Sequence, residues 1–424
     1  MDKQEKSKSI KINNRKTIFI SLLLIMSEIM NNQLFLFIII FYLLVRLFKV
    51  GILKKAIKIN LYLISIFIIG FTIGMIQLAI NSYNFIDFIR DISIFLTPII
   101  FIMFGIYIRY NKSLNINNIY VAIINASIII EIRHLILLIL NIQRILNGAS
   151  IRGIGGNGSY ITTIAIIILL FYKNDIISNY IGNKIKKNIY ISFLLILFVS
   201  YLSRTHIVIL LIGMIINIFL AKKIKIGQIK NFVIFIVISI PIAISVIPKD
   251  TLEQFIYKSL NSFNEVSSDI EYWDEKAINN NWRGYEVYRT KELFKEANAN
   301  EVLFGFGFGK RVDLNIAIYL GNELFTSIPI LHNGYYYILL KTGIIGLIIY
   351  IIFFIKITLK NYKKIYNDDF ESKLLCIVSL SILFASFIVS GIYDKGSIFV
   401  FCLIIGSSFY NKNQKNFIRQ YNKV

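Results

Sequence analysis

Residues 334–355 read GYYYILLKTGIIGLIIYIIFFI, an apolar run interrupted by one charged side chain, Lys341. A helix of about 20 apolar residues spans the hydrocarbon core of a bilayer, and only helices or closed barrels satisfy their backbone polar groups there. Barrel strands would alternate polar and apolar residues, which this run does not do. The run therefore predicts a membrane-spanning helix at 334–357.

Runs of the same kind recur along the chain, in which 56% of the residues are hydrophobic. Lipid rather than water is then the main solvent of the protein. The runs predict an all-α polytopic membrane protein with about 12 transmembrane helices. The predicted spans are 17–30, 33–48, 59–80, 85–108, 118–141, 158–172, 188–202, 205–220, 231–247, 334–357, 373–391 and 396–410.

The positive charge of the chain acts as a topology signal. The formal net charge is +22, but Lys and Arg lie in short clusters between apolar runs, so no nucleic-acid partner is expected. The clusters flank alternate connections only, as the positive-inside rule requires. They lie at 3–16, 46–58, 109–112, 173–187, 222–230, 356–364 and 412–423. This pattern predicts a multi-pass protein of the cytoplasmic (inner) membrane with both termini in the cytoplasm.

One connection, 248–333, is much longer than the others and holds 13 of the 24 Asp and Glu residues. The basic clusters place it on the side opposite the termini. We therefore predict an extracytoplasmic loop subdomain with short helices at 248–333. Transmembrane helices 1–9 precede it in 1–247, and helices 10–12 follow it in 334–424.

Three polar residues from separate parts of the sequence lie on this predicted outer side. Arg204 is in a turn between two spans, Arg283 is in the long loop, and His332 stands where the loop re-enters the bilayer. Each alone has an ordinary explanation: Arg204 contacting headgroups, Arg283 pairing with Glu286, or His332 capping a helix. Together on one side of the membrane they predict a catalytic site.

Further ionisable residues lie in the outer halves of predicted spans, where each charge costs about 2.5 kcal/mol or more. They are Asp87, Arg90, Asp91, Glu131, Arg133, His134 and Lys341. Charges at this depth face a cavity or a partner, so we expect a polar vestibule open to the outside. Asp87 with Arg90, and Glu131 with His134, have helical i,i+3 spacing, and structural pairing explains them equally well.

Two glycine-rich stretches stand out. GIGGNG at 153–158 has dinucleotide-binding spacing, but a membrane span precedes it where the motif needs a strand. Beside Arg152 it predicts a backbone nest for an anionic lipid headgroup, or a plain turn. GFGFG at 305–309 fails that spacing and predicts a tight loop held by Phe306 and Phe308. The three histidines have no His or Cys partner at ligand spacing, so we expect no metal and no cofactor.

Three stretches resemble, in order, the O-antigen polymerase and O-antigen ligase superfamily over about 150–350. They are SRTHIVILLIG from Ser203, WRGYEVYRTKELFKEANANEVLFGFGFG from Trp282 and HNGYYYILLKTGIIGL from His332. The resemblance implies a metal-independent glycosyltransferase of polysaccharide biosynthesis. Its donor would be an undecaprenyl-diphosphate-linked glycan, its partners membrane lipids and a chain-length regulator protein, and its active site extracytoplasmic.

The resemblance also implies roles for single residues. Arg204 and Arg283 would bind the diphosphate, and His332 would assist the acceptor hydroxyl. The substrate-binding residues would be Arg152, Asn333, Tyr336 and Lys341. For Tyr336 and its tyrosine neighbours, stacking on sugars and an interfacial aromatic belt are equally good explanations.

Polymerase and ligase share donor chemistry and differ in acceptor. We favour the polymerase on a general expectation, because polymerases are more diverse and this sequence is divergent. A transporter or flippase also fits the number of spans and the buried charges. Transporters, however, often show paired halves, whereas this chain concentrates its polar length in one loop and its halves do not look alike.

Overall fold

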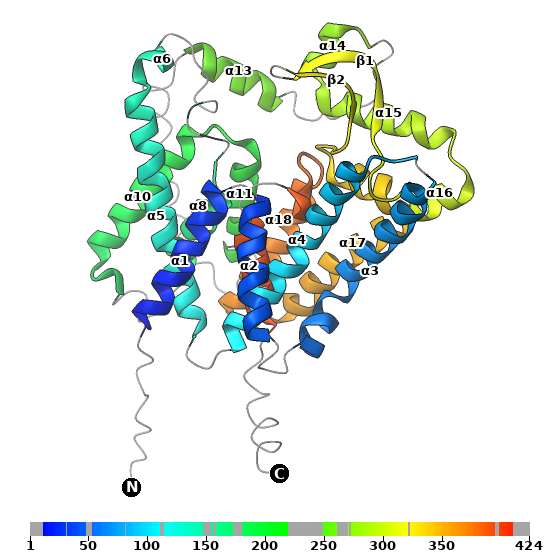
Figure 1. Ribbon diagram of the computed structural model, residues 1–424. Coiled ribbons are helices and arrows are strands. Elements are labelled where there is room, and N and C mark those ends of the chain that lie inside the picture. Colours follow the sequence, from blue (N-terminus) through cyan, green and yellow to red (C-terminus); the bar gives the residue numbers. More distant parts are fainter. Residues whose placement is uncertain are drawn as a thin grey trace, which may run out of the picture.

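The computed structural model describes most of the chain, and all structural statements below refer to that part. The described residues are 12–30, 32–47, 53–80, 82–110, 114–146, 158–172, 180–218, 249–260, 273–320, 323–394 and 398–409, with 154, 156 and 270. They form a bundle of helices that carries short helices and a β-hairpin at one end (Figure 1). We call this end, which bears residues 273–328, the cap end.

Eleven of the twelve predicted spans coincide with helices. These are α1 (Asn14–Ile29), α2 (Asn32–Leu47), α3 (Leu53–Ala79), α4 (Phe85–Tyr110), α5 (Ile116–Leu140), α8 (Tyr160–Phe171), α10 (Lys184–Ser200), α11 (Arg204–Ile218), α17 (Gly334–Ile365), α18 (Phe370–Ala385) and α19 (Ile398–Ser408). The remaining span, 231–247, lies outside the described residues. Among the described helices, α3, α4, α5 and α17 are long and apolar enough to cross a membrane. The others are shorter, so the number of twelve spans stays a prediction.

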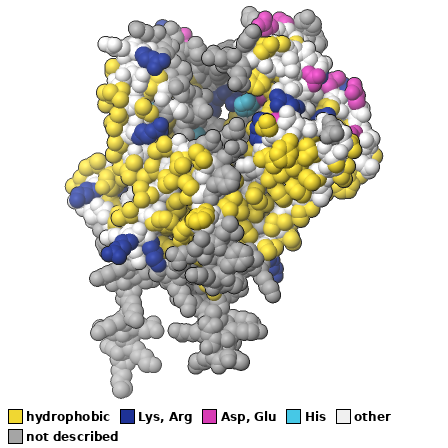
Figure 2. Space-filling model, in the orientation of Figure 1, with side chains coloured by type: hydrophobic (Ala, Val, Ile, Leu, Met, Phe, Trp, Pro, Cys, Tyr) yellow, Lys and Arg dark blue, Asp and Glu magenta, His cyan; other side chains and the backbone are white. Residues whose placement is uncertain are grey.

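Large apolar side chains remain exposed along the outer faces of the helices. Phe41, Ile76, Ile136 and Leu359 are each at least half exposed, and Figure 2 shows apolar side chains covering much of the bundle below the cap end. Soluble proteins rarely expose so much contiguous apolar surface, whereas lipid-facing helices do. The helices and their apolar surface define an integral membrane protein.

The segment predicted as a loop with short helices also contains a small sheet. Its helices are α13 (Lys249–Leu260), α14 (Glu275–Asn280), α15 (Trp282–Lys295) and α16 (Ala299–Phe304). Strand β1 (Val312–Leu320) pairs antiparallel with β2 (Glu323–Ile328), and Val312 lies opposite Ile328. The structure is mostly helical, in agreement with the all-α fold class, and this hairpin is the part that the sequence did not predict. The physical reason for the hairpin is visible in β1, where side chains alternate between buried and exposed from Val312 to Asn315, the period-two pattern of a strand.

The GFGFG stretch at 305–309 inserts between three helices of the bundle. The ring of Phe308 is fully buried, with its centroid 5.6 Å from that of Phe67 on α3 and 4.7 Å from that of Phe95 on α4. The N–H of Phe308 donates to the carbonyl of Gly70 at 2.9 Å, and the N–H of Phe306 donates to Leu340 of α17 at 2.9 Å. The predicted tight loop is confirmed, and it anchors the cap end to the bundle.

Glycine is required on both sides of this contact. Gly305, Gly307 and Gly309 have φ values of 79°, 81° and 94°, in the left-handed region that other residues rarely adopt. A Cβ on Gly307 would lie 2.4 Å from the backbone nitrogen of Gly74 in α3. A Cβ on Gly74 would in turn lie 2.6 Å from the carbonyl oxygen of Phe308. The loop can approach α3 only because neither position has a side chain.

We expect Gly307→Ala to lower the free energy of unfolding by about 2–5 kcal/mol, since left-handed strain of roughly 1–2 kcal/mol adds to overpacking of about 1–3 kcal/mol. The matched control is Gly156→Ala, because Gly156 has a φ of 92° but no atom within 4 Å of its added Cβ. Gly156→Ala should lower the free energy of unfolding by the left-handed strain alone, roughly 1–2 kcal/mol. Thermal unfolding of the detergent-purified chain measures both, and equal losses would contradict the close contact with α3.

Candidate active site

His332 and Glu286 form the polar centre at the cap end of α17. Both carboxylate oxygens of Glu286 accept hydrogen bonds from His332, one from the backbone N–H at 2.8 Å and one from Nδ1 at 2.8 Å. The Glu286 side chain is 1% exposed and the His332 side chain is 53% exposed. Because a carboxylate only accepts, Nδ1 carries the proton. The lone pair on Nε2 of the neutral ring is then available to accept a proton from a ligand.

The short helix α15 sets the position of Glu286. Its Tyr285 hydroxyl donates to the carbonyl of Leu314, and Arg289 Nε donates to the carbonyl of Asp313 at 3.0 Å. Both acceptors belong to strand β1. The hairpin therefore fixes one face of α15, and Glu286 points toward the segment that leads into α17.

The pKa of His332 is raised above its ordinary value of 6.5. The main cause is the hydrogen bond to Glu286, which partial burial opposes, and the negative charge of Glu286 adds to it. The positive charge of Arg283 lowers this pKa, and the negative charge of Asp394 raises it. Arg283, the second residue of α15, and Asp394, just after the 3₁₀ helix η2 (Gly391–Tyr393), thus both lie close enough to act on His332.

A run of contacts leads from Asp394 to the start of α11, where Arg204 lies. The Tyr160 hydroxyl donates to Asp394 Oδ2 at 3.4 Å, and the Tyr160 ring centroid is 4.7 Å from that of His206. His206 Nδ1 lies 2.6 Å from the hydroxyl oxygen of Ser203, and Ser203 is the residue before Arg204. Arg204 and Arg283 are both partly exposed. The structure thus brings the start of α11 to the same end of the bundle as His332, and Figure 2 shows a hollow in this upper part with histidine and basic side chains near it.

Lys341 occupies a different environment from the other predicted site residues. Its side chain and that of Asp91 are both fully buried, with Nζ 2.7 Å from Asp91 Oδ2. Asp91 also accepts the Tyr337 hydroxyl at 2.8 Å and the backbone N–H of Gly309 at 2.7 Å. A substrate has no access to this ammonium group. We therefore assign Lys341 to holding α17, α4 and the GFGFG loop together, in place of the predicted substrate contact.

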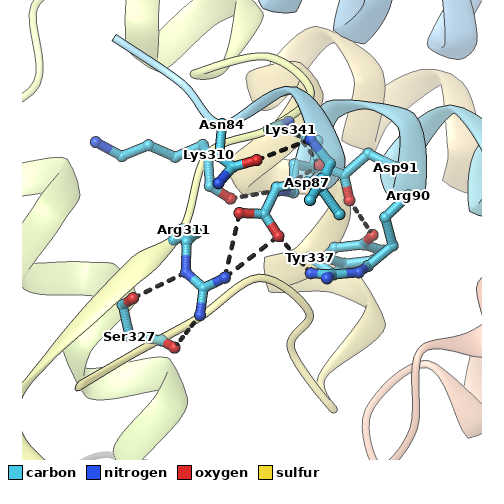
Figure 3. Close-up of polar contacts among 11 residues, drawn as sticks. Asn84, Asp87, Arg90, Asp91, Lys310, Arg311, Ser327, Tyr337 and Lys341 are labelled. Carbon is cyan, nitrogen blue, oxygen red and sulfur yellow. Dashed lines mark hydrogen bonds and ion pairs between the residues drawn. The ribbon is translucent and has the colours of Figure 1, made fainter. Parts of the chain in front are cut away.

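A second ion pair joins the hairpin to α4 at the same level (Figure 3). Arg311 donates to both oxygens of Asp87 at 3.2 Å, and it also donates to the hydroxyl and the carbonyl of Ser327 on β2 at 2.8 Å and 2.6 Å. Asp87 pairs with Arg90 as the i,i+3 spacing predicts. These charges are bound to one another, so they position the cap end on the bundle.

The other predicted substrate-binding residues have separate outcomes. Asn333 is buried and caps α17, because its side chain accepts from the N–H groups of Tyr335 and Tyr336 at 3.1 Å and 3.2 Å. Its amide group also donates to the carbonyl of Phe387 at 3.2 Å, which gives it a structural role, and its predicted substrate contact stays a prediction. Tyr336 is partly buried on the first turn of α17, and its predicted role stays a prediction. Arg152 lies outside the described residues.

Sequence reasoning missed two residues of this centre. Glu286 was considered only as a local partner of Arg283, although it contacts His332, which lies 46 positions further along the chain. Asp394 lies in the short connection between the predicted spans 373–391 and 396–410, where no site residue was predicted. The sequence offers no signal that pairs Glu286 with His332, because the burial of its carboxylate is visible only in the structure. In the described part of the chain, no three His, Cys, Asp or Glu side chains gather as metal ligands would.

Comparison with known protein families gives one match. Residues 189–351 match a family model described as O-Antigen ligase. The matched segment runs from α10 through α11 and the cap end into α17, so it includes Arg204, Arg283 and His332. Comparison with curated proteins and with solved structures gave no match.

The fold and the site define a helical integral membrane protein with a polar centre at one end of the bundle. The family match confirms the predicted resemblance to the O-antigen polymerase and O-antigen ligase superfamily, over the segment 189–351. The match covers 163 of the 424 residues, and over this segment the chain is similar to the O-antigen ligase family.

We expect Lys341→Met to lower the free energy of unfolding by about 3–5 kcal/mol, because the buried carboxylate of Asp91 loses its counter-charge. The control is Lys310→Met, which removes a neighbouring charge that lies 4.9 Å from the Phe306 ring centroid and leaves Asp91 paired. It should cost about 1 kcal/mol or less. Thermal unfolding reports both variants. If Lys341→Met left the midpoint of thermal unfolding unchanged and raised KM, the structural role would be contradicted and the predicted substrate contact supported.

Proposed function

We propose that the protein transfers a glycan from an undecaprenyl-diphosphate carrier to a sugar hydroxyl at the cap end, without a metal ion. One observation carries the proposal: the imidazole of His332 is held by the buried carboxylate of Glu286 with Nε2 left to accept a proton, close to the guanidinium of Arg283. A general base beside a fixed cation suits attack by a hydroxyl on a phosphorylated donor.

The proposed step forms one bond and breaks one. The acceptor oxygen attacks the anomeric carbon of the donor sugar, and its proton passes to Nε2 of His332. The bond from that carbon to the diphosphate oxygen breaks, and the electron pair leaves with the carrier diphosphate. Guanidinium groups make bidentate hydrogen bonds to phosphate, so Arg204 and Arg283 stabilise the charge of the leaving group. Glu286 stabilises the imidazolium that forms.

The acceptor decides between two reactions. We propose polymerisation of carrier-linked repeat units into O-antigen or capsular polysaccharide, on the outer face of the cytoplasmic membrane. A ligase that moves finished glycan to another acceptor is the second candidate, and the similarity to the family described as O-Antigen ligase is compatible with both reactions. The phenotype of a His332→Ala strain separates them. Loss of a polymerase leaves single repeat units on the final acceptor, whereas loss of a ligase leaves long chains on the carrier lipid.

Transfer by the purified protein on a carrier-linked repeat unit tests the proposal directly. We expect His332→Ala, Arg283→Ala and Arg204→Ala each to lower kcat by about 10²-fold or more, the usual loss for a general base or a charge-stabilising donor. The matched control is Lys291→Ala, which removes an exposed charge from the same helix as Arg283 and should retain full activity. Wild-type activity in all three site variants would remove the proposed site. Carrier-linked glycan that crosses a liposome membrane without elongation would indicate a flippase.

The pH dependence follows from the raised pKa of His332. As a base the ring must be neutral, so kcat/KM should rise with pH through an apparent pKa above 6.5. In Glu286→Gln this limb should move to lower pH, because the hydrogen bond and the charge that raise the pKa are gone. The free energy of unfolding should change with pH in the opposite direction to kcat/KM. Protonated His332 stabilises the fold below pH 6.5, and this contribution is lost as pH rises through the folded-state pKa. A pH limb that is unchanged in Glu286→Gln would contradict the dyad.

A further inference from the structure

The end of the bundle opposite the cap end holds a polar cavity. Its volume is about 250 Å³, and helix ends surround it: the ends of α4, α17 and α19 and the starts of α5 and α18. Three of its lining side chains are cationic, namely Arg109, Lys360 and Lys364. We call this end the basic end. Between this end and His332, α17 passes a kink at Gly343. Its stretch from Ile344 to Lys360 alone spans about 24 Å at a rise of 1.5 Å per residue, so the cavity is separate from the proposed active site.

Arg109 is the central side chain of this cavity. It is 7% exposed, and its Nε has no hydrogen-bond partner. Its terminal NH2 group lies 3.8 Å from Glu371, at the outer limit of an ion pair. Within the described residues, the guanidinium thus has one buried donor without a partner and one long ion pair. An unsatisfied buried donor costs about 1–3 kcal/mol, so a ligand that accepts from it would stabilise the protein. The chemistry that satisfies it is an oxyanion.

The helix starts at the cavity add further donors. The N-cap residues Asn115 of α5 and Asp369 of α18 make no side-chain cap hydrogen bond, and both line the cavity. The first N–H groups of a helix attract anions when no side chain caps them. Lys360 lies 5.5 Å from the ring centroid of Phe409, which holds its ammonium group at the cavity wall. With Asp369 and Glu371 counted, the lining retains one excess positive charge.

We infer that this cavity binds a phosphate group, with Arg109 as its buried donor and Lys360 and Lys364 as its outer cations. The positive-inside pattern predicts that the basic end faces the cytoplasm. The phosphate can then come from an anionic lipid headgroup of the inner leaflet or from a soluble phosphate. Both present the same oxyanion to the same residues.

Thermal unfolding of the full-length purified protein tests this site, with sodium phosphate replacing sodium chloride at constant ionic strength. We expect phosphate to raise the midpoint. Lys360→Gln and Lys364→Gln should each need about tenfold more phosphate for the same shift, as expected when one charge-assisted hydrogen bond is lost. The control Lys363→Gln removes an exposed charge from the same turn of α17 that does not line the cavity, and it should behave as wild type.

A second arm identifies the source of the phosphate. The same four proteins are reconstituted in phosphatidylcholine nanodiscs with and without phosphatidylglycerol, and their midpoints are compared. Stabilisation by phosphatidylglycerol but not by inorganic phosphate assigns the cavity to a headgroup, and stabilisation by inorganic phosphate in detergent assigns it to a soluble ligand. Either stabilisation must weaken in Lys360→Gln and Lys364→Gln and stay unchanged in Lys363→Gln. No shift with either probe, or equal shifts in all four proteins, would overturn the inference.

Discussion

The buried pair of Asp91 and Lys341 is the interaction on which the cap end depends. Charges at this depth are costly unless each finds a partner, and removal of one partner leaves the other uncompensated. Asp91 satisfies this condition three times, through Lys341 and Tyr337 of α17 and the backbone N–H of Gly309. Helix α4, helix α17 and the GFGFG loop are therefore joined at one carboxylate.

The proposed site follows from that junction. The GFGFG loop leads directly into β1, and β1 holds α15 through Tyr285 and Arg289. Helix α15 carries Glu286 and Arg283, while the start of α17 carries His332. The dyad therefore connects two elements that are each fixed to the same buried charge, so the geometry of the proposed base is set by packing within the bundle.

Hydrophobic runs predicted the helices well because a membrane span must be both long and apolar. The fold of the cap end was harder to predict from the sequence, since a β-hairpin of two short strands gives a weak period-two signal inside a polar segment. Glu286 and His332 lie 46 positions apart, and only the intervening hairpin brings them together. Lys341 shows the opposite failure: its depth in a span correctly indicated a partner, but sequence alone did not identify that partner as Asp91 rather than a substrate.

The two ends of the bundle differ in the use of their charges. At the cap end acidic groups find partners within the protein, as in the ion pair of Asp87 with Arg311 and the hydrogen bonds of Glu286 with His332. At the basic end Arg109, Lys360 and Lys364 come together from separate basic clusters of the sequence. This asymmetry agrees with a bilayer orientation in which the basic end faces the cytoplasm.

That orientation is the central claim, because the proposed function requires the glycan carrier to reach His332 from the outer side of the membrane. Labelling of single cysteines in intact cells with a membrane-impermeant maleimide measures it directly. Glu275→Cys at the cap end and Lys363→Cys at the basic end are suitable probes, since both residues are exposed and the native Cys376 and Cys402 are buried. We expect Glu275→Cys to react in intact cells and Lys363→Cys only after permeabilisation. The reverse pattern would put the dyad in the cytoplasm and contradict the proposed chemistry.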